Sequence, residues 1–236
     1  MIRLAIERDD IRQKLALLER AASKDKWSRL LLGLKYFISF LRGQRLSSFQ
    51  TKEALAEDFE NIYLPITAQD GLFLYTLARS CHAKRIIEFG SSYGVSALYL
   101  AAAVIDNGGG EFIGTEMNLK KADSVNKIFS ELGWSGTARV IAGDALQTLG
   151  GIDGEWDMLF LDGWKNLYAD VFNLMDSKIK NAGIILAADV DKFKKRTEDF
   201  VNSISESGRF DVVKLPICSG LMFALKKAHA KKDSRL

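Results

Sequence analysis

The stretch that decides the fold is Arg85–Ala101, which reads RIIEFGSSYGVSALYLA. A short isoleucine-rich run, Arg85–Phe89, is followed by a turn that contains two glycines and then by an alanine-rich run with helical spacing. This order is typical of the first strand–turn–helix unit of an α/β protein. Gly90 lets the backbone turn sharply and lets a ligand approach it closely.

Strand-like and helix-like patterns alternate from this unit to the C-terminal region. We expect strands at 85–89, 112–115, 138–142, 158–161, 184–188, 210–215 and 221–226. We expect helices at 67–81, 96–105, 119–132, 145–149, 167–179 and 193–207, with Thr67 as the first N-cap. The alternation predicts an α/β fold with a doubly wound, mostly parallel seven-stranded sheet. The last two strands are expected to close as an antiparallel hairpin around 216–220.

The N-terminal part follows a different pattern. Apolar residues recur at helical spacing in 9–23, the segment 27–41 is apolar on almost all sides, and 53–62 is a short helical pattern. A helix that is apolar all round must be covered by the main domain, a second subunit or a membrane interface. We therefore expect an N-terminal helical extension (1–60), a catalytic domain (61–228) and a basic tail (229–236). The extension would serve as a dimer contact, a substrate lid or a surface attachment.

The composition is that of a globular protein. Of the 236 residues, 47% are hydrophobic and 27% are charged, which excludes bulk disorder. No apolar run reaches the ~18 residues that a membrane span needs, and the first ten residues lack the apolar stretch of a signal peptide. The two cysteines, Cys81 and Cys218, are far apart and indicate neither a disulfide framework nor a zinc site. We expect a soluble cytoplasmic protein.

The net charge of +3 is unevenly distributed. The first fifty residues hold eleven Lys/Arg against five Asp/Glu, and the last eleven residues hold five basic side chains and one acid. Basic ends are able to contact nucleic acid or an anionic membrane surface. No aromatic platform is interleaved with these residues, so we expect no nucleic-acid partner. Contact of the N-terminal helices with a membrane surface stays open, beside the simpler interpretation of solvated helix faces and a frayed tail.

An acid stands at or just after the carboxyl end of each of the first five expected strands. These acids are Glu88, Glu116, Asp144, Asp162 and Asp189. Ligands of doubly wound sheets bind beyond the carboxyl ends of the strands. One acid in such a loop is usually just solvated, but five in the same topological position indicate a ligand-binding α/β enzyme.

The turn after the first strand indicates which ligand to expect. It has an ExGxxxG pattern, Glu88–Gly94, and not the GxGxxG that brings a helix N-terminus against a pyrophosphate. Its acid would repel a diphosphate but can accept a hydrogen bond from an ammonium group. Glu116 can accept two ribose hydroxyls; Asp144 can accept an exocyclic amine, or its neighbouring amide can donate to a ring nitrogen. Ammonium, ribose and adenine together describe S-adenosylmethionine (SAM). The alternative for Gly90 and Gly94 is a tight turn without a ligand.

The runs RIIEFGSSYGVSALYLA, FIGTEMN and VIAGDALQTL resemble the first three motifs of class I SAM-dependent methyltransferases. The run LDGWKNLY, Leu161–Tyr168, is similar to a segment of catechol O-methyltransferase and, more loosely, of the caffeoyl-CoA O-methyltransferase group. The resemblance covers 60–228 and implies a Rossmann-like methyltransferase fold. It implies that SAM contacts Glu88, Gly90, Ser91, Ser92, Tyr93, Gly94, Ser96, Glu116, Met117, Gly143, Asp144, Ala145, Asp162 and Trp164.

In that family a divalent metal, usually magnesium, is held by the fourth-strand Asp and by an Asp–Asn pair after the fifth strand. Asp162 and Asp189 match the two acids, but Val190 stands where the family has Asn. Two carboxylates, waters and a bidentate substrate can still hold Mg²⁺, and Asp191 could be re-aimed to help. Equally, loss of the Asn can mean weak metal binding or none. The alternative role for Asp162 and Asp189 is helix N-capping.

Lys165 matches the catalytic lysine of the family, and we expect Lys165 and Asp162 to be catalytic. An acceptor phenol with a pKa near ~10 must lose its proton, and a nearby lysine can take the proton or stabilise the charge. The alternative for Lys165 is a solvent-exposed lysine at a helix start. Trp164 would form an apolar wall for a planar acceptor or for the methionine part of SAM, or it would simply pack in the core.

The leading hypothesis is an O-methyltransferase that moves a methyl group from SAM to a hydroxyl of a small phenolic or catechol-like acceptor, assisted by Mg²⁺ or another divalent cation. A second is a metal-independent methyltransferase for a sugar or natural-product hydroxyl, which Val190 favours. A third is an RNA-binding methyltransferase or adapter that uses the basic N-terminal helices. A fourth is a non-catalytic interaction protein in which the segment 27–41 mediates dimerisation or membrane-surface attachment. We expect a homodimer.

Overall fold

The computed structural model describes residues 4–24 and 66–228. The helices expected at 27–41 and 53–62 and the basic tail at 229–236 lie outside the described residues. The expected boundary between an N-terminal extension and a catalytic domain at residue 60 lies there too.

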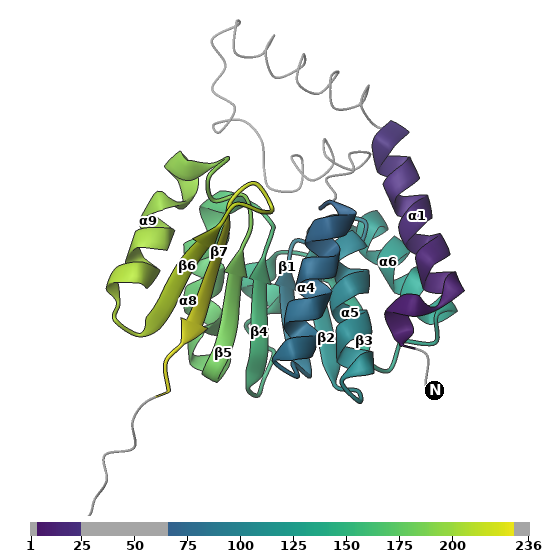
Figure 1. The fold of residues 1–236 in the computed structure, drawn as a ribbon, viewed down its shortest axis with the longest axis horizontal. Helices are drawn as coiled ribbons and strands as arrows, with labels where there is room; N and C mark the ends of the chain where they lie inside the picture. The colour runs from purple at the N-terminus through teal and green to yellow at the C-terminus, as the bar shows by residue number, and fades with distance from the viewer. Residues whose placement is uncertain (1–3, 25–65, 229–236) are drawn as a thin grey trace, which may run out of the picture.

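A seven-stranded sheet in the order β3-β2-β1-β4-β5-β7-β6 forms the centre of the molecule (Figure 1). Its strands are β1 (Arg85–Phe89), β2 (Glu111–Glu116), β3 (Ala138–Ala142), β4 (Trp156–Leu161), β5 (Ile179–Ala187), β6 (Phe210–Leu215) and β7 (Leu221–Lys226). The strands β1 to β5 pair in parallel, and β7 pairs antiparallel with both β5 and β6. The predicted mostly parallel sheet with an antiparallel C-terminal hairpin is confirmed.

Helices cover both faces of the sheet. They are α1 (Asp9–Lys24), α4 (Ala68–Ser80), α5 (Val95–Asp106), α6 (Leu119–Glu131), α7 (Ala145–Thr148), α8 (Tyr168–Met175) and α9 (Lys194–Glu206), with the short 3₁₀ turns η1 (Ala5–Glu7), η2 (Lys165–Leu167) and η3 (Asp176–Lys178). The helices α4, α5 and α6 pack on one face, and α7, α8 and α9 pack on the other. None of these described helices is long and apolar enough to cross a membrane.

The strand sequences explain why both faces are covered. In β1, Ile86 packs in the apolar cluster under α5, whereas Ile87 and Phe89 pack in the cluster under α8. Successive side chains of a strand point to opposite faces, so a strand that is buried on both faces must be apolar throughout. The same two-sided burial holds for β4, where Met158 and Leu159 belong to different clusters.

The helix α1 shares the core of the main sheet. Its buried residues Ile11, Leu15 and Leu18 recur every three or four positions and pack in the same cluster as α5. The carboxylate of Asp106, at the end of α5, accepts a hydrogen bond from the amide of Ala5 at 2.7 Å. Residues 4–24 are therefore anchored to the domain. A role of the N-terminal extension as dimer contact, lid or surface attachment stays a prediction.

The predicted N-cap of α4 is confirmed and forms a capping box. The hydroxyl of Thr67 accepts from the amide of Asp70 at 3.1 Å, and the carboxylate of Asp70 accepts from the amide of Thr67 at 3.2 Å. The other oxygen of Asp70 accepts from the amide of Cys218 at 3.1 Å. Asp70 thereby joins the start of α4 to the loop between β6 and β7.

Candidate active site

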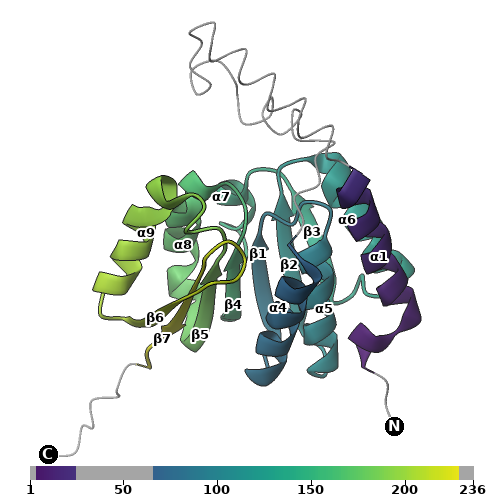
Figure 2. The same ribbon diagram turned by 45° about the horizontal axis from the view of Figure 1, so that its top comes forward.

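The carboxyl ends of β1 to β5 lie at one edge of the sheet, at the top of Figure 1 and turned forward in Figure 2. In the spatial order of the strands, the acids at this edge are Asp144, Glu116, Glu88, Asp162 and Asp189. The neighbours β1 and β4 form the switch point of the sheet, because the chain moves outward from them in opposite directions. Open α/β sheets bind their ligands at such a point.

The turns after β1 and β4 pack backbone against backbone. Gly90 has a φ of +93°, and a Cβ there would come within 2.6 Å of the amide nitrogen of Gly163. The amide of Asp162 donates to the carbonyl of Phe89 at 2.9 Å. A Cβ on Gly163 would in turn overlap the ring of Phe89. Glycine is therefore required on both sides of this contact.

Two further residues of the first turn, Ser92 and Gly94, have a left-handed backbone conformation. Gly94 has a φ of +86° and precedes the first residue of α5. Ser92 has a φ of +47°, a conformation that is uncommon without glycine. Its amide points at the carboxylate of Glu116 and donates to it at 2.8 Å. The half-buried ring of Tyr93 lies 5.1 Å from the Nζ of Lys121. This turn thus connects β1 to the acid at the end of β2.

Glu88 is fully buried at this edge. The hydroxyl of Ser91 donates to its Oε2 at 2.5 Å, whereas Oε1 has no hydrogen-bond partner among the described residues. Burial raises the pKa of Glu88 to about 7; the hydroxyls of Ser91 and Ser96 oppose the shift, and the charges of Asp162 and Glu116 add to it. A buried carboxyl oxygen without a partner is expensive unless a ligand or water pairs with it.

Glu116 is held in a fixed orientation by the backbone. Its Oε2 accepts from the amide of Ser92 at 2.8 Å and its Oε1 accepts from the amide of Asn118 at 2.9 Å. Each carboxylate oxygen has a further lone pair, so two neighbouring hydroxyl groups can still donate to it. Met117 lies half-buried between these residues. The geometry suits the ribose contact expected for Glu116, which stays a prediction.

Asp144 caps the short helix α7. Its Oδ1 accepts from the amide of Leu146 at 3.0 Å. The preceding Gly143 has a φ of +122°, and its amide donates to the carbonyl of Glu116 at 2.9 Å. Ala145 is buried behind the turn. The adenine contacts expected at Asp144 and Ala145 are untested, and the turn lies beside Glu116 as that expectation requires.

Lys165 lies between two carboxylates. Its Nζ is 3.0 Å from Asp162 Oδ1 and 3.0 Å from Asp189 Oδ2. The side chain is only 9% exposed, so the alternative of a solvated lysine at a helix start is wrong. The rings of Tyr168 and Phe193 lie 5.2 Å and 6.0 Å from the same nitrogen. One cation is therefore enclosed by two acids and two aromatic rings.

The two acids are themselves constrained. Burial raises the pKa of Asp162 to about 6; the cation of Lys165 opposes the shift and Asp189 adds to it. Asp189 has a φ of +59°, and its amide donates to the carbonyl of Cys218 at 2.9 Å. Neither acid caps a helix, because Trp164 precedes η2 and Phe193 precedes α9. The capping alternative is wrong for both.

The residues present do not fit an octahedral divalent ion. Val190, at the family's third ligand position, is 3% exposed and packs in the apolar cluster under α8. Asp191 is ion-paired with Lys214 and does not take the place of the missing third ligand. Within 4–24 and 66–228, no three His, Cys, Asp or Glu side chains gather closely enough to hold a metal ion. Mg²⁺ demands oxygen ligands that are free to coordinate, whereas Asp162 and Asp189 are already paired with an ammonium.

Two aromatic residues beside Lys165, Tyr168 and Phe193, were given no role from the sequence. Tyr168, whose hydroxyl donates to the carbonyl of Ala188 at 3.1 Å, follows Lys165 by one helical turn. Phe193 stands in a basic run that reads as a solvated surface. The carbonyl of Cys218 accepts from the amide of Asp189 at this edge. Burial raises the pKa of the Cys218 thiol far above its usual value. Trp164 is half-buried and packs against the cluster under α8, in line with its core interpretation.

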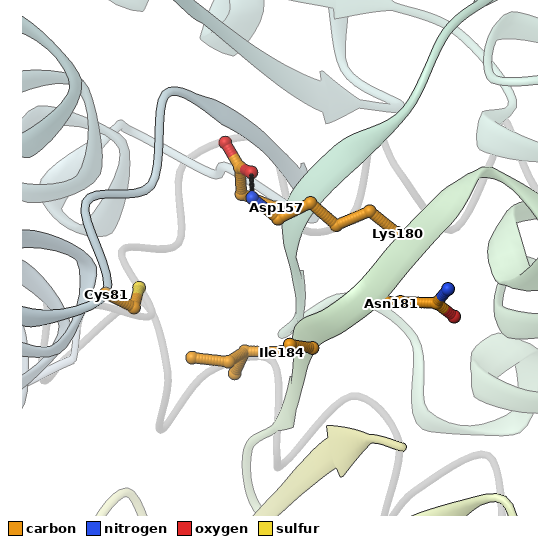
Figure 3. Close-up of a pocket in the computed structure, with 6 residues that line it drawn as sticks. Cys81, Asp157, Lys180, Asn181 and Ile184 are labelled. Carbon is orange, nitrogen blue, oxygen red and sulfur yellow. Dashed lines mark ion pairs between the residues drawn. The ribbon is translucent and has the colours of Figure 1, made fainter. Parts of the chain in front are cut away.

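A cavity of about 390 Å³ lies at the opposite edge of the sheet, where β4 and β5 begin. It is lined by Cys81, Asp157, Lys180, Asn181, Ala182 and Ile184 (Figure 3). The carboxylate of Asp157 is ion-paired with Lys180 and also accepts from the amides of Lys84 and Arg85 at 2.6 and 2.8 Å. Its charged groups are satisfied by one another, and the cavity is remote from the five acids.

Residues 87–190 match the family model described as a methyltransferase domain. The match begins within β1 and ends just after β5, so it includes the edge that carries the acids and Lys165. In keeping with the motifs, the chain is similar to class I SAM-dependent O-methyltransferases of the catechol type.

Two curated proteins that are similar to this chain are catechol O-methyltransferases. The protein from Niastella koreensis is 28% identical over 130 residues, which cover 53% of this chain and 58% of the relative. The protein from Mycobacterium tuberculosis is 30% identical over 103 residues, which cover 43% and 46%. The chain thus spans about half the length of the curated relatives it matches.

A solved O-methyltransferase from Bacillus cereus, in complex with SAH, has the same fold. The TM-score is 0.65 at 19% sequence identity, and the match covers 83% of this chain and 97% of that one. At this identity the likeness establishes the architecture and not the acceptor. The Rossmann-like methyltransferase fold is confirmed.

Proposed function

We propose that this protein is a SAM-dependent O-methyltransferase that moves a methyl group to the hydroxyl of a small phenolic or catechol-like acceptor. The observation that carries the proposal is the buried ammonium of Lys165, held between Asp162 and Asp189 at the switch point of a methyltransferase domain. A cation fixed at a ligand-binding edge is suited to stabilise an oxyanion. The catechol O-methyltransferase activity of the curated relatives supports the same class of acceptor.

The first three turns would bind the cofactor. Gly90 offers a bare backbone, and the unpaired Oε1 of Glu88 can pair with a hydrogen-bond donor of the methionine part. The fixed carboxylate of Glu116 accepts the two ribose hydroxyls, and the turn at Asp144 and Ala145 faces the base. An acidic edge of this kind favours a cationic nucleoside over a nucleotide with phosphates.

The chemistry is an in-line displacement at carbon. The acceptor oxygen forms a bond to the methyl carbon as the carbon–sulfur bond breaks, and the electron pair of that bond stays on sulfur. The acceptor hydroxyl loses its proton, which is difficult for a phenol with a pKa near ~10 unless a positive charge lies beside the oxygen. Lys165 supplies that charge, and Asp162 and Asp189 hold it in position. The rings of Tyr168 and Phe193 provide apolar surface beside the same nitrogen.

Calorimetric titration with SAM tests the cofactor assignment. We expect Glu116→Ala to weaken binding at least tenfold, because the ribose hydroxyls lose charged hydrogen bonds worth about 1.5–3 kcal/mol each. Glu111→Ala is the matched control: Glu111 lies on the same strand at the opposite edge, where it pairs with Arg85 and Arg139. Equal SAM affinity of wild type and Glu116→Ala would remove the basis of the proposal.

A methyl-transfer screen tests the acceptor. Catechols, simple phenols and polyketide-like hydroxyls are incubated with SAM, and the products are read by mass spectrometry. We expect methylated phenolic products with the wild type. Methylation confined to sugars or other aliphatic hydroxyls would contradict the phenolic acceptor. It would support the second hypothesis, a sugar or natural-product hydroxyl, which Val190 favours.

Assembly and location belong to the proposal as well. We propose a cytoplasmic homodimer, with the N-terminal helices as the dimer contact or as an attachment to a membrane surface. Light scattering of the full chain and of a variant without residues 1–60 tests the first, and vesicle flotation tests the second.

A further inference from the structure

The position that the resemblance assigns to a divalent metal contains the chain's own ammonium group. Asp162 and Asp189, which would be the metal-binding acids, both lie 3.0 Å from the Nζ of Lys165. We propose that the enzyme works without a divalent metal, and that Lys165 supplies the positive charge at the acceptor oxygen from the position of the ion. This inference rests on the proposed function.

The ammonium is built into its position and is not a surface group that happens to reach it. Its side chain is 9% exposed, and its nitrogen lies against the rings of Tyr168 and Phe193. Lysine starts the 3₁₀ turn η2, which continues directly into α8, so its backbone is fixed as well. A metal entering between the two acids would have to displace this buried cation.

The ligand set is also incomplete for a metal. The side chain of Val190 carries no donor, and its carbonyl already accepts from the hydroxyl of Thr197 at 3.0 Å. Its amide donates to the carbonyl of Gly220 at 2.9 Å. Asp191 is paired with Lys214 away from Lys165. Two carboxylates and one ammonium sum to a charge of −1, and a divalent ion placed beside the ammonium would reverse this to +1.

The ammonium has the donors that the reaction needs. It carries three N–H groups: one donates to Asp162 Oδ1 at 3.0 Å, Asp189 is held by an ion pair, and the proposal assigns another N–H to the acceptor oxygen. During transfer the O–CH₃ bond forms and the S–CH₃ bond breaks, sulfur keeps the electron pair, and the hydroxyl proton passes to water. Lysine keeps its three protons throughout, so the atoms and charges balance without a further reagent.

Binding of the metal alone is the primary test. The purified full chain is treated with chelator and titrated with Mg²⁺ by calorimetry and with Mn²⁺ by electron paramagnetic resonance. We expect no saturable site at millimolar ion in the wild type. We expect Lys165→Met combined with Val190→Asn to gain a saturable Mn²⁺ site, because the acids are released and the third oxygen is restored. A wild-type site that Asp162→Asn abolishes would overturn the inference.

Activity supplies the second test. We expect chelator-treated wild type and Mg²⁺-supplemented wild type to have the same kcat/KM. Lys165→Met should lose about a hundredfold in kcat, as for loss of one oxyanion donor, with SAM affinity kept within about threefold. Lys195→Met is the matched control, because Lys195 is an exposed lysine of α9. A rate that rises with Mg²⁺ would overturn the inference.

The tests separate this inference from the proposed function. If no acceptor is methylated in either condition, the proposed function fails, while the Mn²⁺ titration still decides whether the acids hold a metal. If an acceptor is methylated only with Mg²⁺, the proposed function stands and the metal-free role of Lys165 is wrong. Lys165→Arg, which keeps the charge, should retain more activity than Lys165→Met, and unchanged SAM affinity checks that both variants are folded.

Discussion

Gly90 and Gly163 pack against each other across the turns that follow β1 and β4, and neither has room for a Cβ. We expect Gly90→Ala to destabilise the protein by more than the ~1–2 kcal/mol of left-handed strain, because the new methyl group also overlaps the backbone of the second turn. Urea denaturation followed by circular dichroism measures the loss. SAM binding should weaken in parallel.

The control for Gly90→Ala separates the strain of a left-handed backbone from the steric overlap of the new methyl group. Gly133 has a φ of +75°, but among the described residues no atom beyond its chain neighbours lies within 4 Å of the place that a Cβ would take, so Gly133→Ala reports strain alone. Equal losses of stability for Gly90→Ala and Gly133→Ala would show that the two turns do not pack as described.

Glu88 should make stability fall with rising pH. Its pKa is 4.5 when unfolded and about 7 when folded, so the folded protein binds more protons between these values. The stability that protonated Glu88 contributes is fully present below pH 4.5 and is lost as the pH rises through 7. The loss is on the order of 3 kcal/mol. Glu88→Gln, which stays neutral, should therefore flatten the dependence of Tm on pH between about 5 and 8.

The matched control is Glu206→Gln, which changes an exposed carboxyl at the end of α9. It should leave the pH profile as in the wild type. If Glu88→Gln keeps the wild-type slope, the carboxyl of Glu88 titrates in the folded state as it does in water.

Asp106 should be a point of attachment for the N-terminal segment. It accepts from the amide of Ala5 at 2.7 Å and from the hydroxyl of Tyr75 at 2.9 Å. Asp106→Ala leaves two donors without an acceptor, at a cost of about 1–3 kcal/mol each where they are buried. We expect faster hydrogen exchange in α1 with little change in β1.

Asp106 also affects the pKa of Tyr75. Burial, followed by the hydrogen bond to Asp106, raises the pKa of Tyr75 to about 12. Alkaline titration of tyrosinate absorbance should show one tyrosine moving to lower pH in Asp106→Ala, yet staying above the usual value because burial persists. Tyr75→Phe should remove that transition and keep α1 protected through Ala5.

Asp70 should matter more than its place in a helix cap suggests. Thr67→Ala removes part of the capping box, whereas Asp70→Ala also removes the acceptor for the amide of Cys218. Loss of a cap costs about 1 kcal/mol. We expect Asp70→Ala to cost about 1 kcal/mol more than Thr67→Ala and to speed exchange of the Asp189 amide, which donates to Cys218. Equal effects of the two variants would mean that Asp70 acts on α4 alone.

The strands were predictable where glycine or polar residues bound an apolar run. The strands β1 and β3 have the predicted bounds, because Gly90 and Gly143 end their runs. The predicted start of β5 was wrong: a helix was expected through Ile179, but Ile179 is the first residue of the strand. Val171, Met175 and Ile179 keep helical spacing, but the chain leaves the helix after Met175 and Ala182 adopts a φ of +59° within the strand.

The site was predictable as far as topology fixes it. Parallel strands end at one edge, so the five acids could be placed there from the order of the elements. The contact of Lys165 with Asp189 could not, because it joins residues on different strand ends and depends on how the loops fold. Neither could the left-handed Cys218 and Ser219, since no local pattern marks non-glycine residues for that conformation.

The loop between β6 and β7 determines when a newly synthesised chain can become active. Cys218 is 148 positions from Asp70, to which its amide is bonded, and its carbonyl holds Asp189 in place. A nascent chain that has emerged only as far as Asp189 possesses the five acids and Lys165, but lacks the loop whose carbonyl at Cys218 accepts from the amide of Asp189. A ribosome-stalled or C-terminally truncated chain that lacks β6, β7 and their loop should therefore remain inactive, and activity should appear only once this hairpin has been added.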